Sequence, residues 1–150
     1  ELHYIEEFGL YWEQQGLPRM TGRIMAWLLI CDPPEQTMND LVDVLQASKS
    51  SISTGTRLLI QFGFIERVSL PGERRDYYRL VPGFWVNVLI EKSGQFSDFL
   101  QLAERGMALM APDDAPRRKR LEEMHSLYAF LAREYPKLLQ RWRVESGLLE

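Results

Sequence analysis

Apolar residues recur along most of this chain at the three- and four-residue spacing that is typical of amphipathic helices. The first such segment covers residues 2–16. A second begins near Pro18, a residue that suits the first turn of a helix, and runs to about Ile30, before a Pro-Pro pair. The pattern therefore predicts two helices at the start of the chain.

Two shorter helices are predicted next, joined by a tight turn. The first covers about 39–46, with Asn39 as a candidate N-cap. Ser48 can cap the second helix, 49–62, which Gly63 ends. Two short helices with this connection are typical of a helix-turn-helix motif.

A β-hairpin is predicted directly after these helices. Residues 64–70 and 76–81 are rich in β-branched and aromatic side chains, and the segment 71–75 between them contains Pro, Gly and three charged residues. Two long helices follow, the first ending near Met110 and the second running from about Pro116 to about Leu148.

This order of elements predicts a mainly α fold with a small β component. It is a winged helix-turn-helix with a two-stranded wing and long N- and C-terminal dimerisation helices. We expect the chain, 1–150, to be a single unit. Within it, 32–81 would form the DNA-binding region, and 1–31 together with 82–150 the helical dimerisation region.

The helix predicted at 49–62 has two different faces. Ile52, Thr56 and Leu59 recur at helical spacing on the face expected to pack on a core. The opposite face carries short hydroxyl side chains and one arginine, which suits close approach to base edges and phosphates. Our predicted DNA-binding residues are Ser48, Lys49, Ser50, Ser51, Ser53, Thr54, Arg57, Arg74 and Arg75.

A capped helix face exposed to water is the alternative for these residues, and it is about equally favoured when the helix is considered alone. The basic turn of the adjacent hairpin favours DNA, because a second cationic contact would fall beside the major-groove helix. Residues 48–79 carry six basic and three acidic side chains, although the whole chain has a net charge of −3. An acidic protein with one basic face can bind DNA.

The segments 16–24, 41–53, 57–65 and 71–78 together resemble MarR-type winged-helix regulators, and among these the GbsR-like subgroup, named for a repressor of glycine betaine synthesis genes. The resemblance implies an obligate dimer with interlocked first and last helices, a fourth helix in the major groove and a wing near the minor groove. It also implies control by a small-molecule effector, which no motif identifies.

Many MarR-type wings carry Asp-x-Arg, and the matching positions here are Glu73 and Arg75. Glu73 departs from that pattern, so the resemblance implies a DNA-facing arginine at Arg75 more firmly than a wing-bracing acid at Glu73. We therefore expect a regulator that binds double-stranded DNA as a homodimer on a roughly palindromic operator. Repression is expected and activation stays open. The alternative is a winged-helix protein-interaction module without sequence-specific DNA binding.

An apolar stripe with alternating spacings of three and four runs along the last predicted helix, as in helices that pack on one another. It favours a seam shared with a partner subunit over a seam within the chain, because the chain has little else to cover it. With two residues from the first helix, the predicted dimerisation residues are Phe8, Trp12, Leu121, Met124, Tyr128, Leu131, Tyr135, Leu138 and Trp142.

The sequence gives little indication of disulfide, metal-binding or catalytic chemistry. The single cysteine, Cys31, excludes an internal disulfide and is more typical of a packed side chain than of a redox switch. His3 and His125 have no ligand-spaced partners, so no metal site is predicted. The basic run 117–120 is more typical of a solvated helix end than of a second DNA contact. With no phosphate loop or nucleophile–base pair, we expect no cofactor and no enzyme activity.

Membrane insertion is not expected. No stretch approaches the ~18 apolar residues that a membrane span needs. The first residues lack the basic and apolar runs of a secretory signal. We therefore expect a cytoplasmic protein.

Overall fold

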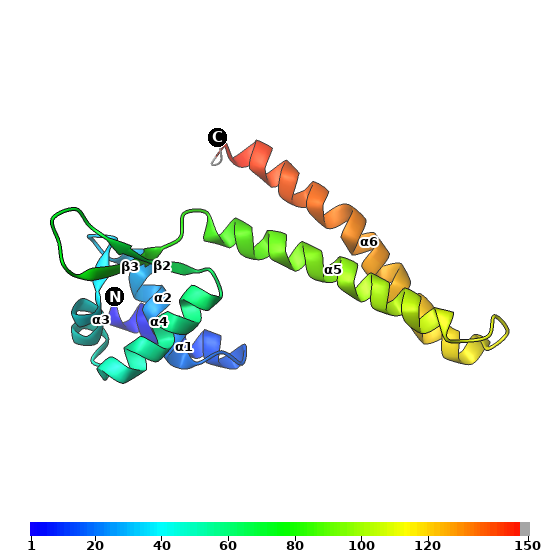
Figure 1. Ribbon diagram of the computed structural model, residues 1–150, viewed down its shortest axis with the longest axis horizontal. Coiled ribbons are helices and arrows are strands. Elements are labelled where there is room, and N and C mark those ends of the chain that lie inside the picture. Colours follow the sequence, from blue (N-terminus) through cyan, green and yellow to red (C-terminus); the bar gives the residue numbers. More distant parts are fainter. Residues whose placement is uncertain (148–150) are drawn as a thin grey trace. The chain divides into compact units, whose positions relative to one another are not determined.

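The computed structural model describes residues 1–147, and the chain divides after Phe84 into two compact units. The first unit contains α1 (Leu2–Gln14), α2 (Arg19–Ile30), β1 (Gln36–Thr37), α3 (Met38–Leu45), α4 (Lys49–Gln61), β2 (Ile65–Ser69) and β3 (Asp76–Leu80) (Figure 1). The second contains α5 (Phe84–Ala108), which begins at the boundary, and α6 (Ala115–Ser146). The mainly α winged helix-turn-helix is therefore confirmed. The predicted helix end near Leu148 lies outside the described residues.

The start of α3 differs from the prediction. Thr37, not Asn39, is the N-cap: its hydroxyl accepts a hydrogen bond of 3.1 Å from the Asp40 amide. The Asp40 carboxylate in turn accepts one of 2.7 Å from the Thr37 amide. This reciprocal capping box satisfies two amide groups at the helix start, which a single side chain at Asn39 could not do.

The N-terminus of α4 is as predicted. The Ser48 hydroxyl accepts a hydrogen bond of 3.2 Å from the Ser51 amide, so Ser48 caps the helix. Gln46, between α3 and α4, adopts a left-handed conformation with φ of 48°, which turns the chain sharply between the two helices. The buried side chains of α4 include Ile52, Thr56 and Leu59, the predicted inward face.

The sheet has one strand more than the predicted two-stranded wing. Its order is β1-β3-β2, and all neighbouring strands are antiparallel. β2 and β3 form the predicted hairpin, with Ile65 opposite Leu80 and Ser69 opposite Asp76. The extra strand, β1, has only two residues, too few to produce the alternating pattern from which a strand can be predicted.

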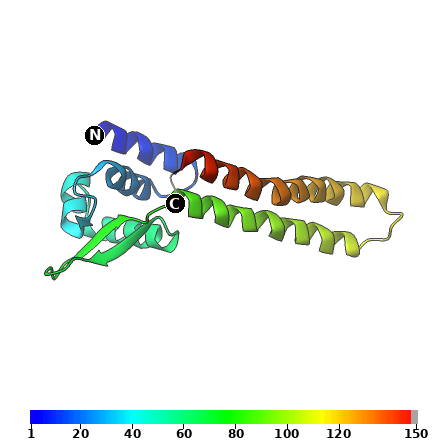
Figure 2. The same cartoon turned by 90° about the horizontal axis from the view of Figure 1, so that it is seen from above.

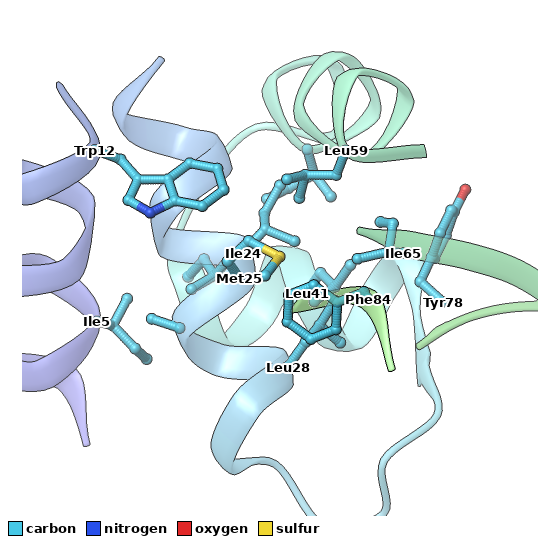
Figure 3. Close-up of a cluster of buried hydrophobic side chains, with 13 residues drawn as sticks. Ile5, Trp12, Ile24, Met25, Leu28, Leu41, Leu59, Ile65, Tyr78 and Phe84 are labelled. Atoms are coloured by element: carbon cyan, nitrogen blue, oxygen red, sulfur yellow. The ribbon is translucent and has the colours of Figure 1, made fainter. Parts of the chain in front are cut away.

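The core of the first unit includes residues of both N-terminal helices. Ile5 of α1 and Ile24 and Met25 of α2 are fully buried with Leu41 of α3 and Leu59 of α4 (Figure 3). Helices α1 and α2 therefore pack with the winged-helix elements in the first unit. The assignment of 1–31 and 82–150 to a dimerisation region stays a prediction.

In the second unit, α5 and α6 form an antiparallel hairpin (Figure 2). The Phe99 ring stacks on Tyr128 with centroids 4.9 Å apart, and Phe96 meets Tyr135 edge-on at 5.1 Å. Toward the start of α5 and the end of α6 the two helices diverge (Figure 1). No residue of α6, which lies wholly in the described part of the chain, is fully buried.

Candidate nucleic-acid interface

The outward face of α4 is a band of small polar side chains with two cations. Lys49, Ser50, Thr54 and Arg57 are exposed, and Ser53 is half-buried between them. No large apolar side chain separates them along this face, because Ile52 and Leu59 turn toward the core at helical spacing, and the exposed Ile60 follows only after Arg57. The backbone of α4 can therefore approach a flat or grooved surface closely.

One of the predicted DNA-binding hydroxyls also has a structural task. The Ser48 hydroxyl is committed to the N-cap of α4 and lies 3.1 Å from the Ser50 hydroxyl. The backbone amide of Ser51 donates to the Ser48 hydroxyl. The side chain of Ser51 is half-buried, in a pocket that Met20 and Thr21 of α2 also line. Lys49, Ser50, Ser53, Thr54 and Arg57 are thus the members of the predicted helix set that no capping contact occupies.

A groove separates α4 from the β2–β3 hairpin within the first unit. Ser53 and Arg57 line one side, Arg67 and Glu66 of β2 the other, and Tyr78 of β3 contributes to the lining. The outward face of α4 and the hairpin are therefore neighbouring surfaces of one compact unit.

The ion pairs divide the basic residues of the hairpin into two groups. Arg79 lies 2.8 Å from Glu66 and 3.6 Å from Glu35, and Arg67 lies 3.4 Å from Asp76. The Glu66 hydrogen bond is the largest cause that raises the pKa of Arg79 above its ordinary value. Both arginines belong to the body of the sheet, where their charges are balanced by carboxylates.

The second group is unpaired. Within residues 1–147, no carboxylate lies at ion-pair distance from Lys49, Arg57, Arg74 or Arg75. All four are exposed, two on α4 and two in the turn of the hairpin. A cation without a carboxylate neighbour keeps its full charge available for a phosphate. The basic character of this region therefore concentrates on the α4 face and the wing turn.

The acid at the tip of the wing, Glu73, forms no ion pair with a described residue, and its amide donates to the Leu70 carbonyl at 3.1 Å. The bracing of the wing comes instead from the Arg67–Asp76 and Arg79–Glu66 pairs. Sequence reasoning missed these pairs, although Glu66 stands directly opposite Arg79 once the hairpin register is known.

The predicted dimerisation residues fall into three groups. Trp12 is only 7% exposed and lies 5.5 Å, ring to ring, from Phe64, while Phe8 is half-buried beside it. Leu121, Tyr128 and Tyr135 contact α5 within the chain, through Gly106, Phe99 and Phe96 respectively. The remaining positions are half-buried or exposed along α6, namely Met124, Leu131, Leu138 and Trp142.

The basic run that begins α6 is largely accounted for by local contacts. Arg117 pairs with Asp114 at 3.0 Å, and Arg118 lies 3.6 Å from Glu122. Arg118 also donates to the Met107 carbonyl, at 3.2 Å, near the end of α5. The run therefore helps to close the α5–α6 hairpin.

Cys31 is half-buried at the end of α2. Burial raises the pKa of its thiol above the ordinary value, and the charges of Asp32 and Glu35 add to this effect. Within residues 1–147, no cluster of three or more His, Cys, Asp or Glu side chains could hold a metal ion. None of the helices in this part of the chain has the length and apolarity needed to cross a bilayer.

Comparison with known proteins identifies the family. The family described as "MmpR5-like MarR family transcriptional regulator" matches residues 83–145. The HTH-type transcriptional regulator MmpR5 of Mycobacterium tuberculosis (strain ATCC 25618 / H37Rv) is 36% identical over 146 residues, covering 97% of this chain and 88% of that protein. The chain belongs to the MarR family of transcriptional regulators.

A solved structure described as a transcriptional regulator resembles this MarR-family chain throughout. It is 37% identical, with a TM-score of 0.76, over 93% of this chain and 95% of that one. MarR-family regulators act by binding DNA, so the expectation that the chain is not an enzyme is confirmed. The matching family carries the description MmpR5-like, and the GbsR-like subgroup is not confirmed.

Proposed function

We propose that this MarR-family regulator represses transcription as a homodimer that binds a roughly palindromic operator. In this proposal α4 enters the major groove and the turn of the β2–β3 hairpin contacts the flanking backbone or minor groove. The set of unpaired cations carries the proposal: Lys49, Arg57, Arg74 and Arg75 have no carboxylate neighbour, whereas Arg67 and Arg79, in the same hairpin, do.

The chemistry of the α4 face supports base recognition in addition to phosphate binding. Arg57 can reach the two acceptor atoms of a guanine, and the hydroxyls of Ser50, Ser53 and Thr54 can serve base edges or phosphates. The capped N-terminus of α4 also presents backbone amides and the positive end of the helix dipole, which favour a phosphate. A protein-interaction module would not need this combination of short side chains and unpaired cations.

The exposure of α6 supports the dimer. Leu127, Phe130 and Leu138 are 54%, 52% and 50% exposed, in a 32-residue helix without a fully buried side chain. A surface groove beside them is lined by Phe130, Leu131, Tyr135 and Leu138, among others. Exposed apolar surface on this scale is typical of a surface that another chain covers. A second copy, related by a two-fold axis, supplies the matching surface.

A two-fold dimer also explains why a single recognition helix suffices per chain. Two copies of α4 spaced by about 34 Å would meet successive turns of the major groove on one side of the duplex. The operator is then expected to contain two similar half-sites in opposite orientation. The sequence specificity of each half-site depends on α4, and the dimer doubles the number of contacts.

The decisive experiment is selection of bound fragments from random duplex DNA, followed by titration of the selected duplex at several salt concentrations. We expect a two-fold symmetric site and an affinity that falls steeply with salt as counterions are released. The matched control is a variant with Lys49, Arg57, Arg74 and Arg75 all replaced by Gln, which should lose the binding. Equal binding by parent and variant would exclude α4 and the wing turn as the DNA-contacting surface.

Repression and small-molecule control follow from the resemblance to the MarR-type family, and the GbsR-like subgroup stays a prediction. A reporter gene placed behind the selected site tests repression, since an activator would raise its expression. A regulator of genomic DNA acts where that DNA is, which in a bacterial cell is the cytoplasm. An effector would be detected as a compound that releases the regulator from the selected duplex.

A further inference from the structure

Arg23, in the middle of α2, joins three helices of the first unit. Its Nε donates to Glu6 Oε1 of α1 at 2.7 Å, and its Nη2 donates to the carbonyl oxygen of Leu45 at 2.8 Å. Leu45 is the last residue of α3. The side chain of Arg23 is only 18% exposed, so this fork of hydrogen bonds is largely sheltered from water. The DNA-contacting residues proposed above do not include Arg23 or Glu6.

The carbonyl that Arg23 holds is at the turn of the helix-turn-helix. The last carbonyls of a helix have no intrahelical donor, so Leu45 needs a partner from elsewhere. Gln46 follows at once with its left-handed φ of 48°, and Ser48 caps α4 two residues later. The Leu45 carbonyl that Arg23 binds therefore lies at the turn from which α4 begins.

Close packing of α1 on α2 restrains the aliphatic part of the Arg23 side chain. A Cβ added at Gly22 would lie 2.9 Å from the Gly9 Cα, so the two backbones nearly touch. A Cβ at Gly9 would lie 2.8 Å from Arg23 Cγ, so the stem of the arginine lies directly beneath α1. Glu6 also accepts a hydrogen bond of 2.7 Å from Arg19, which restrains its carboxylate from the opposite side.

A second contact from α2 meets the middle of α4. A Cβ at Gly55 would lie 2.6 Å from Ile24 Cδ1, so Ile24 sits directly against the α4 backbone. Consecutive residues of α2 thus contact both helices of the helix-turn-helix: Arg23 binds the last residue of α3, and Ile24 packs against the middle of α4. The apolar contact fixes the distance of α4 from α2. The polar contact fixes the turn that precedes α4.

We propose that Arg23, held in place by Glu6, is a positioning residue for DNA recognition. Through its hydrogen bond to the Leu45 carbonyl, Arg23 holds the turn before α4 in place relative to α1, and it makes no contact with DNA itself. The inference rests on the proposed operator binding by α4. It assigns α1 to the DNA-reading unit and provides a path by which a displacement of α1 would reach the recognition helix.

The test compares Glu6→Gln with Glu7→Gln. Both variants remove one negative charge from adjacent positions of α1, but Glu7 is exposed and forms no ion pair with a described residue. Electrostatics alone predicts that either change leaves DNA affinity unchanged or raises it, because a repulsive charge is lost. Positioning predicts the opposite for Glu6→Gln: a loss of operator affinity of about two- to thirtyfold, the range measured for residues that couple distant sites.

Two further readouts separate positioning from general stability and from direct contact. Affinity is measured well below the thermal midpoint of each variant, so that only folded protein is compared. The slope of affinity against salt should be the same for Glu6→Gln, for Arg23→Lys and for the parent, because no phosphate contact is lost. A combined Glu6→Gln/Arg23→Lys variant should bind the operator no more weakly than Arg23→Lys alone, since both changes break the same Glu6–Arg23 contact.

Each outcome decides the proposal. If Glu6→Gln lowers the thermal midpoint but binds the operator as Glu7→Gln does, the pair is structural only and the inference is wrong. A shallower salt slope for Arg23→Lys would instead make Arg23 a phosphate contact and also overturn it. Failure of the parent to bind any selected duplex would overturn the proposed function itself, which is a distinguishable result.

Discussion

Arg57 and Ser53 lie one turn apart on the exposed face of α4, with Arg57 Nη2 3.5 Å from the Ser53 hydroxyl oxygen. This contact places the guanidinium along the helix beside the small side chains. No carboxylate of the described residues competes for it. The pair is therefore the centre of the proposed base-reading surface.

Replacing Arg57 with Ala should alter the base preference of the regulator at one position of each half-site. Loss of a specific base contact costs about 1–3 kcal/mol, whereas a non-preferred base at that position should then cost little. Ser53→Ala should have a smaller effect of the same kind. Competition titrations with single-base variants of the selected duplex measure this. The control is Arg67→Ala, since Arg67 is paired with Asp76.

A second prediction concerns the wing turn. Arg75→Ala should weaken binding by a similar factor on all duplexes and reduce the salt slope by about one, because one phosphate contact is lost. Arg120→Ala, in the basic run of α6, should leave both quantities unchanged. An equal effect of the two substitutions would indicate that net charge, and not the position of Arg75, governs binding.

Local patterns explain which parts of this molecule could be predicted from the sequence. The Ser48 cap and the two faces of α4 depend on residues within one or two turns of each other, so periodicity and capping rules were sufficient. The predicted N-cap of α3, Asn39, lies two residues after the observed one, Thr37, because both residue types are good N-caps. The strand β1 was missed because two residues carry no pattern.

Features that depend on tertiary contacts could not be predicted in the same way. The Glu6–Arg23 pair joins residues 17 apart on crossing helices, and it becomes visible only when the Gly9–Gly22 crossing is known. The stripe of α6 was assigned to a partner subunit, whereas Tyr128 and Tyr135 meet α5 within the chain. A heptad stripe shows that a helix packs on another helix and does not show which one.

The Glu6 ion pairs predict a specific dependence of stability on pH. Partial burial acts to raise the pKa of Glu6, but the hydrogen bonds and charges of Arg19 and Arg23 outweigh it and hold this pKa below the ordinary value. A carboxylate whose pKa is lowered by folding contributes stability above its unfolded pKa of about 4.3, and this contribution is lost as the pH falls through the folded pKa.

Glu6→Gln should therefore lower the thermal midpoint at pH 6–7 relative to the parent, and the difference should disappear as the pH falls below about 4. Glu7→Gln controls for the change in net charge and should show no such convergence. A difference between Glu6→Gln and the parent that persisted unchanged at low pH would mean that packing, not the ion pair, is what the substitution disturbs.

Cys31 should react slowly with thiol reagents in the folded protein. Burial, together with the nearby charges of Asp32 and Glu35, raises the pKa of its thiol, so less of the reactive thiolate is present at neutral pH. Alkylation by iodoacetamide at pH 7 should be slower in the native protein than in denaturant, where the rate should approach that of a free cysteine. Faster reaction in the folded state would point to an activated, redox-sensitive thiol.

The apolar surface of α6 predicts which substitutions would dissociate the proposed dimer. Leu138 is 50% exposed and Trp142 is 41% exposed in the C-terminal half of α6. A charge at such a position costs the single chain little, because the side chain already faces water. In a two-fold dimer the same substitution occurs twice, and burial of the exposed half of two leucines is worth about 1.5–3 kcal/mol of association free energy.

Leu138→Asp should thus shift the regulator toward a folded monomer at micromolar concentration, while its helix content and thermal transition persist. Gln140→Asp, an exposed polar position on the same helix, adds the same charge and should leave the dimer intact. Sedimentation of both variants and the parent measures this directly.

Because one α4 and one wing make too few contacts for specific affinity, Leu138→Asp should also bind the selected duplex far more weakly, although α4 and the wing are unchanged. A parent protein that sediments as a monomer and still binds its operator tightly would show that α6 has no partner subunit.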